Sequence, residues 1–242
     1  MIPKVVHYCW FGRGKKPELV IKCINSWKRI LSDYEVKEWN EDNFDLDMYP
    51  YAREAYNSCK FAFVTDVVRL YVLYHEGGIY MDTDVEVVKS LDPFLHHCAF
   101  LGFESDEDIS TGIMASEKGG LWVKENLNHY VGRHFIKKDG TLDITTNVIV
   151  VTDALFLHGL KRDNSYQDFP GFITIYPKDI FSPKSYTDGK IRLTENTVTI
   201  HHFAGSWGTF RDKMKKNVFR FIARNRVWYW LYQRTYKRMK RS

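Results

Sequence analysis

Two acidic residues, Asp82 and Asp84, are separated by one threonine at the end of the short apolar run 79–81. Carboxylates at positions i and i+2 leave the backbone close together, and at the end of a strand they reach the edge where open α/β sheets bind ligands. Oxygen atoms of this kind suit Mg²⁺ or Mn²⁺, which commonly bridge carboxylates to phosphate oxygens. A solvated turn is the alternative, but the apolar residues on both sides would leave unpaired carboxylates beside a core, which is costly without a cation or donors.

A second pair of charged residues, Asp66 and Arg69, lies on the predicted helix 60–75. Residues three apart on a helix share a face, so the two side chains can pair or reach the same ligand. The alternative is a structural ion pair at the helix surface. The helix is expected to end at Gly77 and Gly78, because glycine readily takes the left-handed conformation found after helices.

Two histidines, His201 and His202, follow the apolar end of the predicted strand 197–203. Imidazole can complete a manganese site that carboxylates begin. Strand alternation sends the two rings to opposite sides, so only one of them should reach the site. We predict that His202 is the metal ligand, because it is nearer the small-residue loop 204–208; a structural histidine is the alternative.

Alternating and helical apolar patterns predict the elements that position these residues. A strand at 5–10, a helix at 17–31 and a strand at 34–39 form the opening unit of a nucleotide-binding α/β sheet. Further strands are expected at 79–81, 85–88, 100–103, 144–151 and 172–176, with helices near 121–135 and 153–160. The predicted fold class is α/β, with a Rossmann-like mixed sheet flanked by helices.

Bulk composition is that of one globular domain with an appendage. The chain has 242 residues, 44% of them apolar, which is enough for a sizeable core. Its four cysteines have no metal-type spacing and are expected to be reduced thiols. The N-terminus lacks the pattern of a signal peptide, and no stretch is long enough to span a bilayer, so we expect a cytoplasmic protein.

Residues 211–242 form a basic tail, whereas 1–210 is predicted to be the catalytic domain. The tail holds twelve Lys or Arg residues and one acidic residue, Asp212, so the rest of the chain is acidic although the net charge is +5. Its aromatic residues, such as Phe221 and Trp228, lie near one helical stripe flanked by arginines. We expect an interfacial helix on an anionic bilayer, at the inner face of the cytoplasmic membrane. Packing on the domain is the alternative; no nucleic-acid recognition motif accompanies the charge.

Three separated segments resemble glycosyltransferase family 32, and together they cover about residues 1–210. They are the opening 2–12, the stretch 61–85 around Asp82 and Asp84, and the closing 201–207. The group includes bacterial capsule and lipopolysaccharide transferases and fungal initiating mannosyltransferases, and it is related to the large glucosylating toxins. The resemblance implies a GT-A fold and transfer with retention of configuration. The toxins are much longer, so acceptor recognition does not carry over.

The resemblance also implies roles for individual residues. Asp84 would bind the metal, and Asp82 would contact the ribose and sugar of the donor. Asp66 and Arg69 would hold the donor sugar and its phosphate, and Trp10 would stack on the base. By the same resemblance, the Ser206 hydroxyl and the Trp207 indole would close over the diphosphate. The residues assigned to catalysis are Asp82, Arg69 and Trp207.

The expected reaction moves a hexose or N-acetylhexosamine from a nucleotide sugar, with a UDP-sugar favoured, to a saccharide or lipid-linked acceptor in surface polysaccharide synthesis. Mn²⁺ or Mg²⁺ and Arg69 would stabilise charge on the diphosphate. No general base is evident. Glu104 and Asp106 follow a predicted strand and are interpreted as a solvated loop, with a place along the acceptor side as the alternative. Two other readings are a metal-dependent phosphohydrolase or nucleotidyltransferase, and a carbohydrate-binding protein with the same fold and no turnover.

Overall fold

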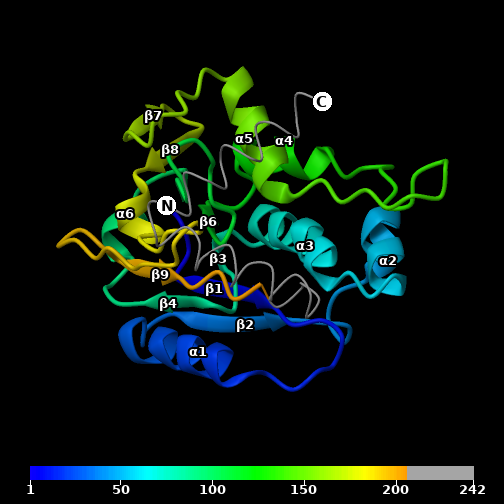
Figure 1. The fold of residues 1–242 in the computed structure, drawn as a ribbon, viewed down its shortest axis with the longest axis horizontal. Helices are drawn as coiled ribbons and strands as arrows, with labels where there is room; N and C mark the ends of the chain where they lie inside the picture. Colours follow the sequence, from blue (N-terminus) through cyan, green and yellow to red (C-terminus); the bar gives the residue numbers. More distant parts are fainter. Residues whose placement is uncertain (206–242) are drawn as a thin grey trace, which may run out of the picture.

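The computed structural model describes residues 1–205 (Figure 1). Residues 206–242 lie outside the described range, and with them the predicted tail 211–242, Ser206 and Trp207. The division into a domain at 1–210 and a tail therefore stays a prediction. No helix within residues 1–205 combines the length and the apolar character needed to cross a bilayer.

The chain opens with the parallel β-α-β unit that its apolar pattern predicts. β1 (Val5–Cys9) and β2 (Glu35–Trp39) pair in parallel, and α1 (Glu18–Ile30) connects them. The buried face of α1 includes Val20, Cys23, Ile24 and Trp27, which recur at helical spacing. Because β1 and β2 run the same way, their C-terminal ends lie at one edge of the sheet.

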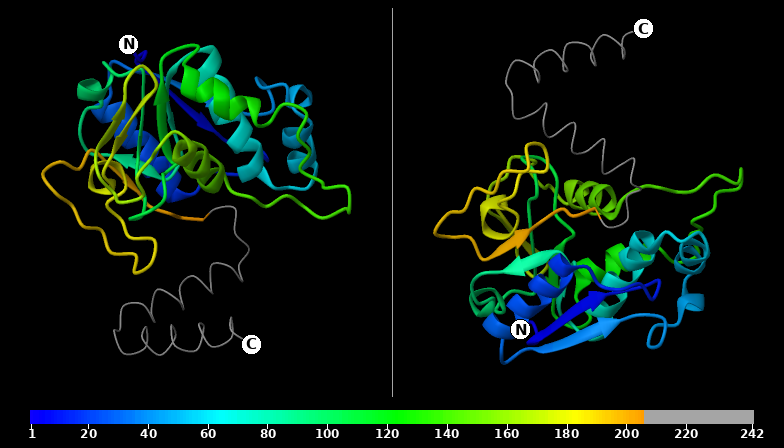
Figure 2. Two further views of the ribbon diagram at one scale, coloured as in Figure 1. Left: turned by 90° about the horizontal axis from the view of Figure 1, so that it is seen from above. Right: turned by 60° about the horizontal axis from the view of Figure 1, so that its bottom comes forward.

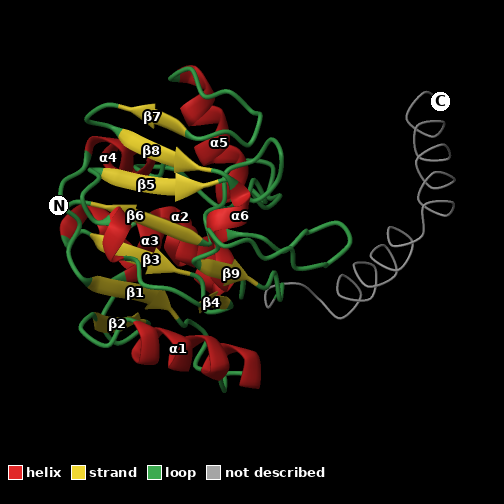
Figure 3. Cartoon of the chain, turned by 90° about the vertical axis from the view of Figure 1, so that its left-hand side faces the viewer, coloured by secondary structure: helices red, strands yellow, loops and turns green. Residues whose placement is uncertain are grey.

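Seven strands form the main sheet, in the order β2-β1-β3-β6-β5-β8-β7 (Figure 3). The remaining strands are β3 (Gly78–Met81), β5 (Ala99–Gly102), β6 (Ile113–Ser116), β7 (Gln167–Phe169) and β8 (Ile173–Tyr176). β1 is parallel to β3 and β5 is parallel to β8, whereas β6 is antiparallel to both of its neighbours. The prediction of a GT-A type mixed sheet flanked by helices is confirmed.

Helices cover both faces of the sheet (Figure 1). One face packs against α2 (Pro50–Asn57), α3 (Phe61–His75), α4 (Leu121–Asn128) and α5 (Asn147–Leu157). The other face packs against α1 and α6 (Lys178–Phe181). The central strand β3 is buried on both sides, because Tyr80 joins the first core while Ile79 and Met81 join the second. Short 3-10 turns at Leu46–Met48 and Asp92–Phe94 complete the connections.

After β3, the chain enters a second, smaller sheet of two strands. β4 (Val85–Val87) pairs antiparallel with β9 (Thr199–His201), so Val85 lies opposite His201. The indole N–H of the fully buried Trp27 donates to the Val85 carbonyl at 2.7 Å, which fixes β4 against α1. The aspartate turn 82–84 therefore lies on the seam between the two sheets.

The expectation of a strand at 144–151 is wrong, because this segment enters the helix α5. Its β-branched residues favour a strand locally, but Val151, Thr152 and Leu155 bury one face at helical spacing, and packing overrides local propensity. The helix expected at 121–135 ends at Asn128, and the connection 129–146 extends away from the body (Figure 2). β6, β7, α2 and α6 are not anticipated, since each is short and lacks a strong apolar period.

Gly78, the first residue of β3, packs closely against the backbone of β1. Its φ is +105°, and a Cβ there would lie 2.6 Å from the Val5 carbonyl oxygen. We expect Gly78→Ala to lower the free energy of unfolding by about 3 kcal/mol, because strain and a backbone clash add together. Urea denaturation followed by circular dichroism measures this change.

The matched control is Gly132→Ala, at a left-handed glycine with open space around the position of its Cβ. Only conformational strain applies there, and the expected loss is about 1 kcal/mol. Equal losses for the two variants would show that the clash at Gly78 relaxes.

Candidate functional site

The turn 82–84 is pinned from both sides by backbone hydrogen bonds. The Asp82 N–H donates to the Gly112 carbonyl at 2.8 Å, next to β6, and the Val85 N–H donates back to the Asp82 carbonyl at 2.9 Å. On the other side, the His202 N–H donates to the Asp84 carbonyl at 3.0 Å. Residues from three separate parts of the sequence thus fix where the two carboxylates point.

The carboxylates of Asp82 and Asp84 meet the imidazole of His201. His201 Nε2 lies 3.4 Å from Asp84 Oδ1 and 4.0 Å from Asp82 Oδ2. One ligand atom from each of these three side chains lies within 4.8 Å of the other two. Within residues 1–205, no other group of three His, Cys, Asp or Glu side chains is as close. Two carboxylates and one imidazole are ligands that suit Mn²⁺ and also accept Mg²⁺.

His201, rather than His202, reaches the aspartates, and the choice made from the sequence is corrected here. Alternation along β9 does separate the two rings, as expected. His202 turns away and its Nε2 lies 2.8 Å from Glu86 Oε2, a carboxylate that also accepts from Lys22 at 2.9 Å. Nearness to the loop 204–208 does not decide the matter, because the register Val85 to His201 places the earlier ring beside Asp84.

Gly112 makes room for the His201 ring. A Cβ at Gly112 would lie 2.7 Å from both Cε1 and Nδ1 of His201, so no larger residue fits without moving the ring. His201 is buried, and its Nδ1 has no hydrogen-bond partner among the residues that the structure describes. Gly112, which the sequence analysis passed over, is therefore needed to seat the imidazole.

Arg69 is buried beside the aspartates, with the residue only 5% exposed. Its Nη2 lies 3.3 Å from Asp66 Oδ1 and 3.4 Å from Asp82 Oδ1, while Nη1 donates to the Thr111 carbonyl at 2.6 Å. The Tyr80 hydroxyl donates to the same Asp82 oxygen at 2.9 Å. The structure therefore brings Asp66, Arg69 and Asp82 together. The pair of Asp66 and Arg69 is buried, so it is not an ion pair at the helix surface.

Charge and burial oppose one another among the acids of the site. Burial alone would raise the pKa of Asp84, but the neighbouring His201 and the Ala204 N–H, which donates to Asp84 Oδ2 at 2.6 Å, hold that pKa well below its usual range. Burial raises the pKa of Asp66 to about 7 in spite of Arg69. Burial lowers the pKa of His201, but Asp84 and Asp82 outweigh it and the pKa is raised. Asp84 is thus kept ionised.

Glu104 is drawn into the site, contrary to its interpretation as part of a solvated loop. Burial raises the pKa of its carboxyl to about 7, and the nearby His201 and the Ser110 hydroxyl lower it only in part. Asp106 keeps the expected character, since its side chain is 78% exposed and pairs with Lys178 at 2.5 Å. With Glu104, acids outnumber cations around His201, and this excess favours binding of a cation.

Asn147, at the first turn of α5, is a further residue that sequence reasoning missed. It is 2% exposed, and its backbone N–H donates to Asp66. Neither Oδ1 nor Nδ2 of its side chain has a hydrogen-bond partner within residues 1–205. A buried amide of this kind is costly to leave unpaired, so a hydroxyl-rich ligand beside Asp66 suits it. No motif in the sequence distinguishes it from other asparagines.

Trp10 follows β1 and so shares the C-terminal edge of the sheet with Asp82, which follows the neighbouring β3. It is half-buried, its indole N–H donates to the Gly14 carbonyl at 2.6 Å, and the Lys16 ammonium lies 5.6 Å from its ring. Its proposed role in stacking on a base stays a prediction. Ser206 and Trp207 lie outside the described residues.

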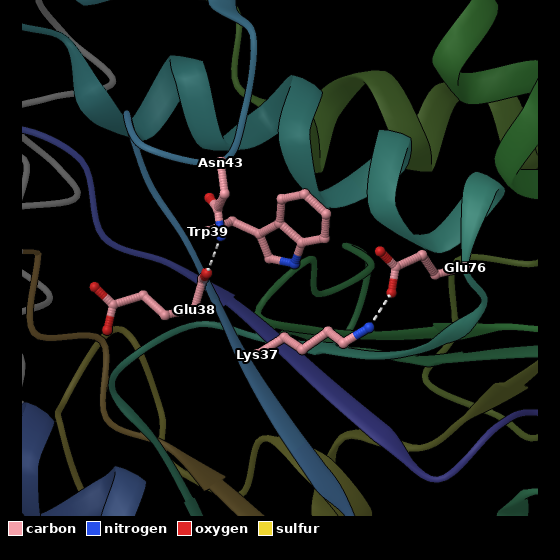
Figure 4. A pocket seen from close by; sticks show the side chains of 5 residues that line it. All are labelled: Lys37, Glu38, Trp39, Asn43 and Glu76. Carbon is pink, nitrogen blue, oxygen red and sulfur yellow. Dashed lines mark hydrogen bonds and ion pairs between the residues drawn. The ribbon is translucent and has the colours of Figure 1, made fainter.

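A separate cavity of about 380 Å³ lies beside the edge strand β2, lined by Lys37, Glu38, Trp39, Asn43 and Glu76 (Figure 4). Its charged groups are already paired, because Lys37 Nζ lies 2.8 Å from Glu76 Oε2. The Asn43 amide likewise donates to the Glu38 carbonyl at 2.8 Å. This cavity contains none of the residues gathered around Asp84.

Comparison with known families and proteins gives the site a context. Residues 17–101 match the family described as glycosyltransferase sugar-binding region containing DXD motif. The resemblance to glycosyltransferase family 32 is thereby confirmed over this range, which includes α3, Asp82 and Asp84. The inositol phosphoceramide mannosyltransferase 3 of Schizosaccharomyces pombe is 34% identical over 139 residues, covering 53% of this chain and 38% of that protein.

A second relative is the mannosyl phosphorylinositol ceramide synthase CSH1 of Saccharomyces cerevisiae, 29% identical over 56% of this chain and 38% of that protein. The chain thus spans less than two fifths of the length of these curated relatives. Among solved structures, a glycosyltransferase involved in the glycosylation of the major capsid of PBCV-1 is 13% identical, with a TM-score of 0.49, over 89% of this chain and 98% of that one. A fold likeness of this degree carries no information about substrates.

Substitution of the two histidines should affect metal affinity differently. We expect His201→Ala to weaken Mn²⁺ binding about tenfold or more, because it removes one of three ligand groups. His202→Ala should leave the affinity within about twofold, since His202 faces Glu86. Electron paramagnetic resonance of free Mn²⁺ measures both, and the reverse order would return the ligand role to His202.

Metal affinity should also depend on pH through His201. Its raised pKa means that the imidazole holds a proton up to a higher pH than an ordinary histidine, and the proton must leave before the ring can bind a cation. Mn²⁺ affinity should therefore be full above that pKa and fall by about tenfold per pH unit below it. Asp84 adds nothing to this dependence near neutrality, because its pKa is low. An affinity that is constant between neutral and mildly acidic pH would contradict the assignment.

Proposed function

We propose that the chain is a metal-dependent glycosyltransferase that moves a hexose or N-acetylhexosamine from a nucleoside-diphosphate sugar to an acceptor hydroxyl. The observation that carries the proposal is the Asp82, Asp84 and His201 cluster at the C-terminal edge of β3, next to the buried Asp66 and Arg69. The family match over residues 17–101 supports the same reaction class.

The ligand set fits one divalent cation, Mn²⁺ or Mg²⁺. Asp84 would be its ionised ligand, His201 would supply the nitrogen, and Asp82 would lie between the cation and the donor. A bound cation neutralises the negative charge that develops on the leaving diphosphate. The ring of His201 is held in place by its fit against Gly112, so it needs little rearrangement to serve.

Arg69 has most of its N–H groups committed to Asp66, Asp82 and the carbonyls of Thr65 and Thr111. We infer that its main task is to orient the two carboxylates and to offset their charge. Asp66 can then accept from sugar hydroxyls while the Asn147 amide donates to them and accepts from them. The donor sugar would accordingly lie between α3 and the first turn of α5.

The chemistry of transfer is proposed to be electrostatic, with retention of configuration. The chain would bind and orient the donor, and the acceptor hydroxyl would lose its proton largely to the departing phosphate. No covalent intermediate on the protein is required. The cation identity, the retention of configuration and the roles of Ser206 and Trp207 belong to this proposal.

The printed names of the curated relatives bear on donor and acceptor. One is named an inositol phosphoceramide mannosyltransferase and the other a mannosyl phosphorylinositol ceramide synthase, so we propose GDP-mannose beside the UDP-sugars as a candidate donor for this chain. For the acceptor, we propose a hydroxyl on a lipid-linked head group or oligosaccharide at the cytoplasmic face of a membrane. Surface polysaccharide synthesis is one process that uses such acceptors.

Of the two rival functions, the phosphohydrolase or nucleotidyltransferase has less support. Enzymes of that kind commonly gather carboxylates for two metals, whereas the described residues hold one cluster with two carboxylates and a histidine. A carbohydrate-binding protein without turnover would use the same residues to bind sugar. Turnover itself separates it from the proposed enzyme.

A panel of donors tests the proposal. The full chain is incubated with Mn²⁺ and, separately, GDP-mannose, UDP-glucose, UDP-galactose and UDP-N-acetylglucosamine, and the free nucleoside diphosphate is measured. We expect release from one donor or a small subset, and a fall of about 100-fold in Asp84→Asn, because an electrostatic group at the diphosphate is lost.

The matched control is Asp106→Asn, which changes an exposed aspartate of the loop after β5 and should leave release unchanged. Absence of release with every donor would favour the binding protein. Release of a nucleoside monophosphate together with a sugar phosphate, in place of the nucleoside diphosphate, would favour the phosphohydrolase.

A further inference from the structure

Phe203 follows β9 in a strained backbone conformation. Its φ is +50°, in the left-handed region that bulky residues rarely adopt. Hydrogen bonds on either side hold it there, because the His202 N–H donates to the Asp84 carbonyl at 3.0 Å and the Ala204 N–H donates to Asp84 Oδ2 at 2.6 Å. In this conformation the buried Phe203 ring lies 4.1 Å from the His201 ring, centroid to centroid. Backbone strain that the surroundings maintain beside a binding site points to a function.

Tyr186 extends this row of rings towards the surface. Its ring lies 5.6 Å from that of Phe203, at an interplanar angle of 89°. A perpendicular contact of this kind covers at most one face of the tyrosine ring, and Tyr186 is 52% exposed. A large part of Tyr186 is therefore accessible to a ligand, one ring away from the imidazole of the metal cluster.

The backbone that carries Tyr186 is fixed against the site. Tyr186 belongs to loop 184–193, which projects from the body before β9 (Figure 2). An antiparallel bridge between Lys184 and Ile191 closes this loop. The Lys184 ammonium donates to the His202 carbonyl at 2.7 Å, which ties the loop to the end of β9. Little of the loop has to be ordered when a ligand arrives, and this lowers the cost of binding.

The chemistry of an accessible aromatic ring suits a sugar. A pyranose or cyclitol ring offers a face of C–H groups that packs on an aromatic ring, while its hydroxyls stay hydrated. In the proposed function the cation binds the diphosphate, Asp66 and Asn147 face the donor sugar, and Trp10 is left for the base. The acceptor is then the substrate without a partner. Its hydroxyl has to come close to the departing phosphate that takes its proton, and a platform beside His201 meets this need.

We propose that Tyr186 is the platform on which the acceptor stacks, and that the acceptor presents a pyranose or cyclitol ring to it. Phe203 supports the platform by holding the Tyr186 ring at a fixed place beside His201. Stacking favours a ring over an acyclic hydroxyl compound, because only a flat face covers the aromatic surface. The assignment of this ring to the acceptor rests on the proposed function.

The test is saturation-transfer difference NMR on the full chain with Mg²⁺. The probes are methyl α-D-mannopyranoside, methyl β-D-galactopyranoside and myo-inositol, with glycerol as the acyclic comparison. We expect at least one ring compound to bind, and glycerol not to bind. Tyr186→Ala should raise the dissociation constant of that compound about tenfold, because the platform is lost. Tyr186→Phe keeps the ring, so the constant should stay within about twofold.

The matched control is Tyr166→Ala. Tyr166 is 54% exposed and lies edge-on to Tyr176 at 5.3 Å, so it resembles Tyr186 in exposure and in packing. Its partner belongs to β8, the third strand from β3 in the main sheet. Binding of the ring compound should therefore change by less than about twofold. Thermal unfolding verifies that all three variants are folded.

Several results would overturn the platform. They are the absence of binding by every ring compound, equal binding to Tyr186→Ala and the unmodified chain, and equal losses in Tyr186→Ala and Tyr166→Ala. Weaker binding of UDP or GDP to Tyr186→Ala, with unchanged binding of the ring compounds, assigns Tyr186 to the donor base instead. An equal loss of Mn²⁺ affinity, measured by electron paramagnetic resonance, would show a structural role.

Nucleotide release from the donor panel is measured independently of these binding experiments. Binding of a ring compound that depends on Tyr186, without nucleotide release from any donor, supports the platform and contradicts the proposed enzyme. Nucleotide release together with ring binding that ignores Tyr186 contradicts the platform alone. Failure of the proposed function and failure of the platform are thus distinguishable.

Discussion

The buried guanidinium of Arg69 is the charge on which the acidic site depends. Burying a carboxylate without a partner is prohibitive, and a buried pair persists only when further hydrogen bonds satisfy it. Arg69 meets this condition by contacting Asp66 and Asp82 and by donating to the carbonyls of Thr65 and Thr111. The helix α3, the strand β3 and the segment before β6 are thereby held in one arrangement.

The second constraint is the seam between the two sheets. β3 ends at Met81 inside the main sheet, and β4 begins at Val85 inside the small one. The intervening turn connects the two sheets and belongs to neither. Its backbone is fixed by hydrogen bonds to neighbouring segments, whereas its side chains can face a ligand. Gly112 and the backbone of His202 anchor the turn from opposite sides. Rigid backbone with outward carboxylates is what a preorganised ion site needs.

Much of this arrangement can be predicted from the sequence, because strong local patterns specify it. The β-α-β opening, the helix α3 and the strand before Asp82 follow from apolar periodicity and from the two glycines at 77–78. The pairing of Asp66 with Arg69 follows from their spacing. These features depend on neighbours in the chain, so the local sequence is sufficient to find them.

Other features depend on contacts that no local pattern records. The choice between His201 and His202 is set by the register of β9 on β4, and the space for the ring is set by Gly112. Glu104 and Asn147 join the site because β5 and α5 end or begin beside it. The strand predicted at 144–151 is wrong for the same reason, since the packing that makes this segment helical comes from distant residues.

The pairing of β4 with β9 also constrains the order in which the chain can fold. Asp84 and the Ala204 N–H that it accepts from are 120 residues apart, and β9 is the last strand of the described range. During synthesis from the N-terminus, the aspartates leave the ribosome long before their partners exist, and contacts of such long range form late. The acidic turn must therefore remain hydrated until the last strand arrives. The site becomes competent only when nearly all of the domain is present, so truncated chains with the complete aspartate motif would lack it.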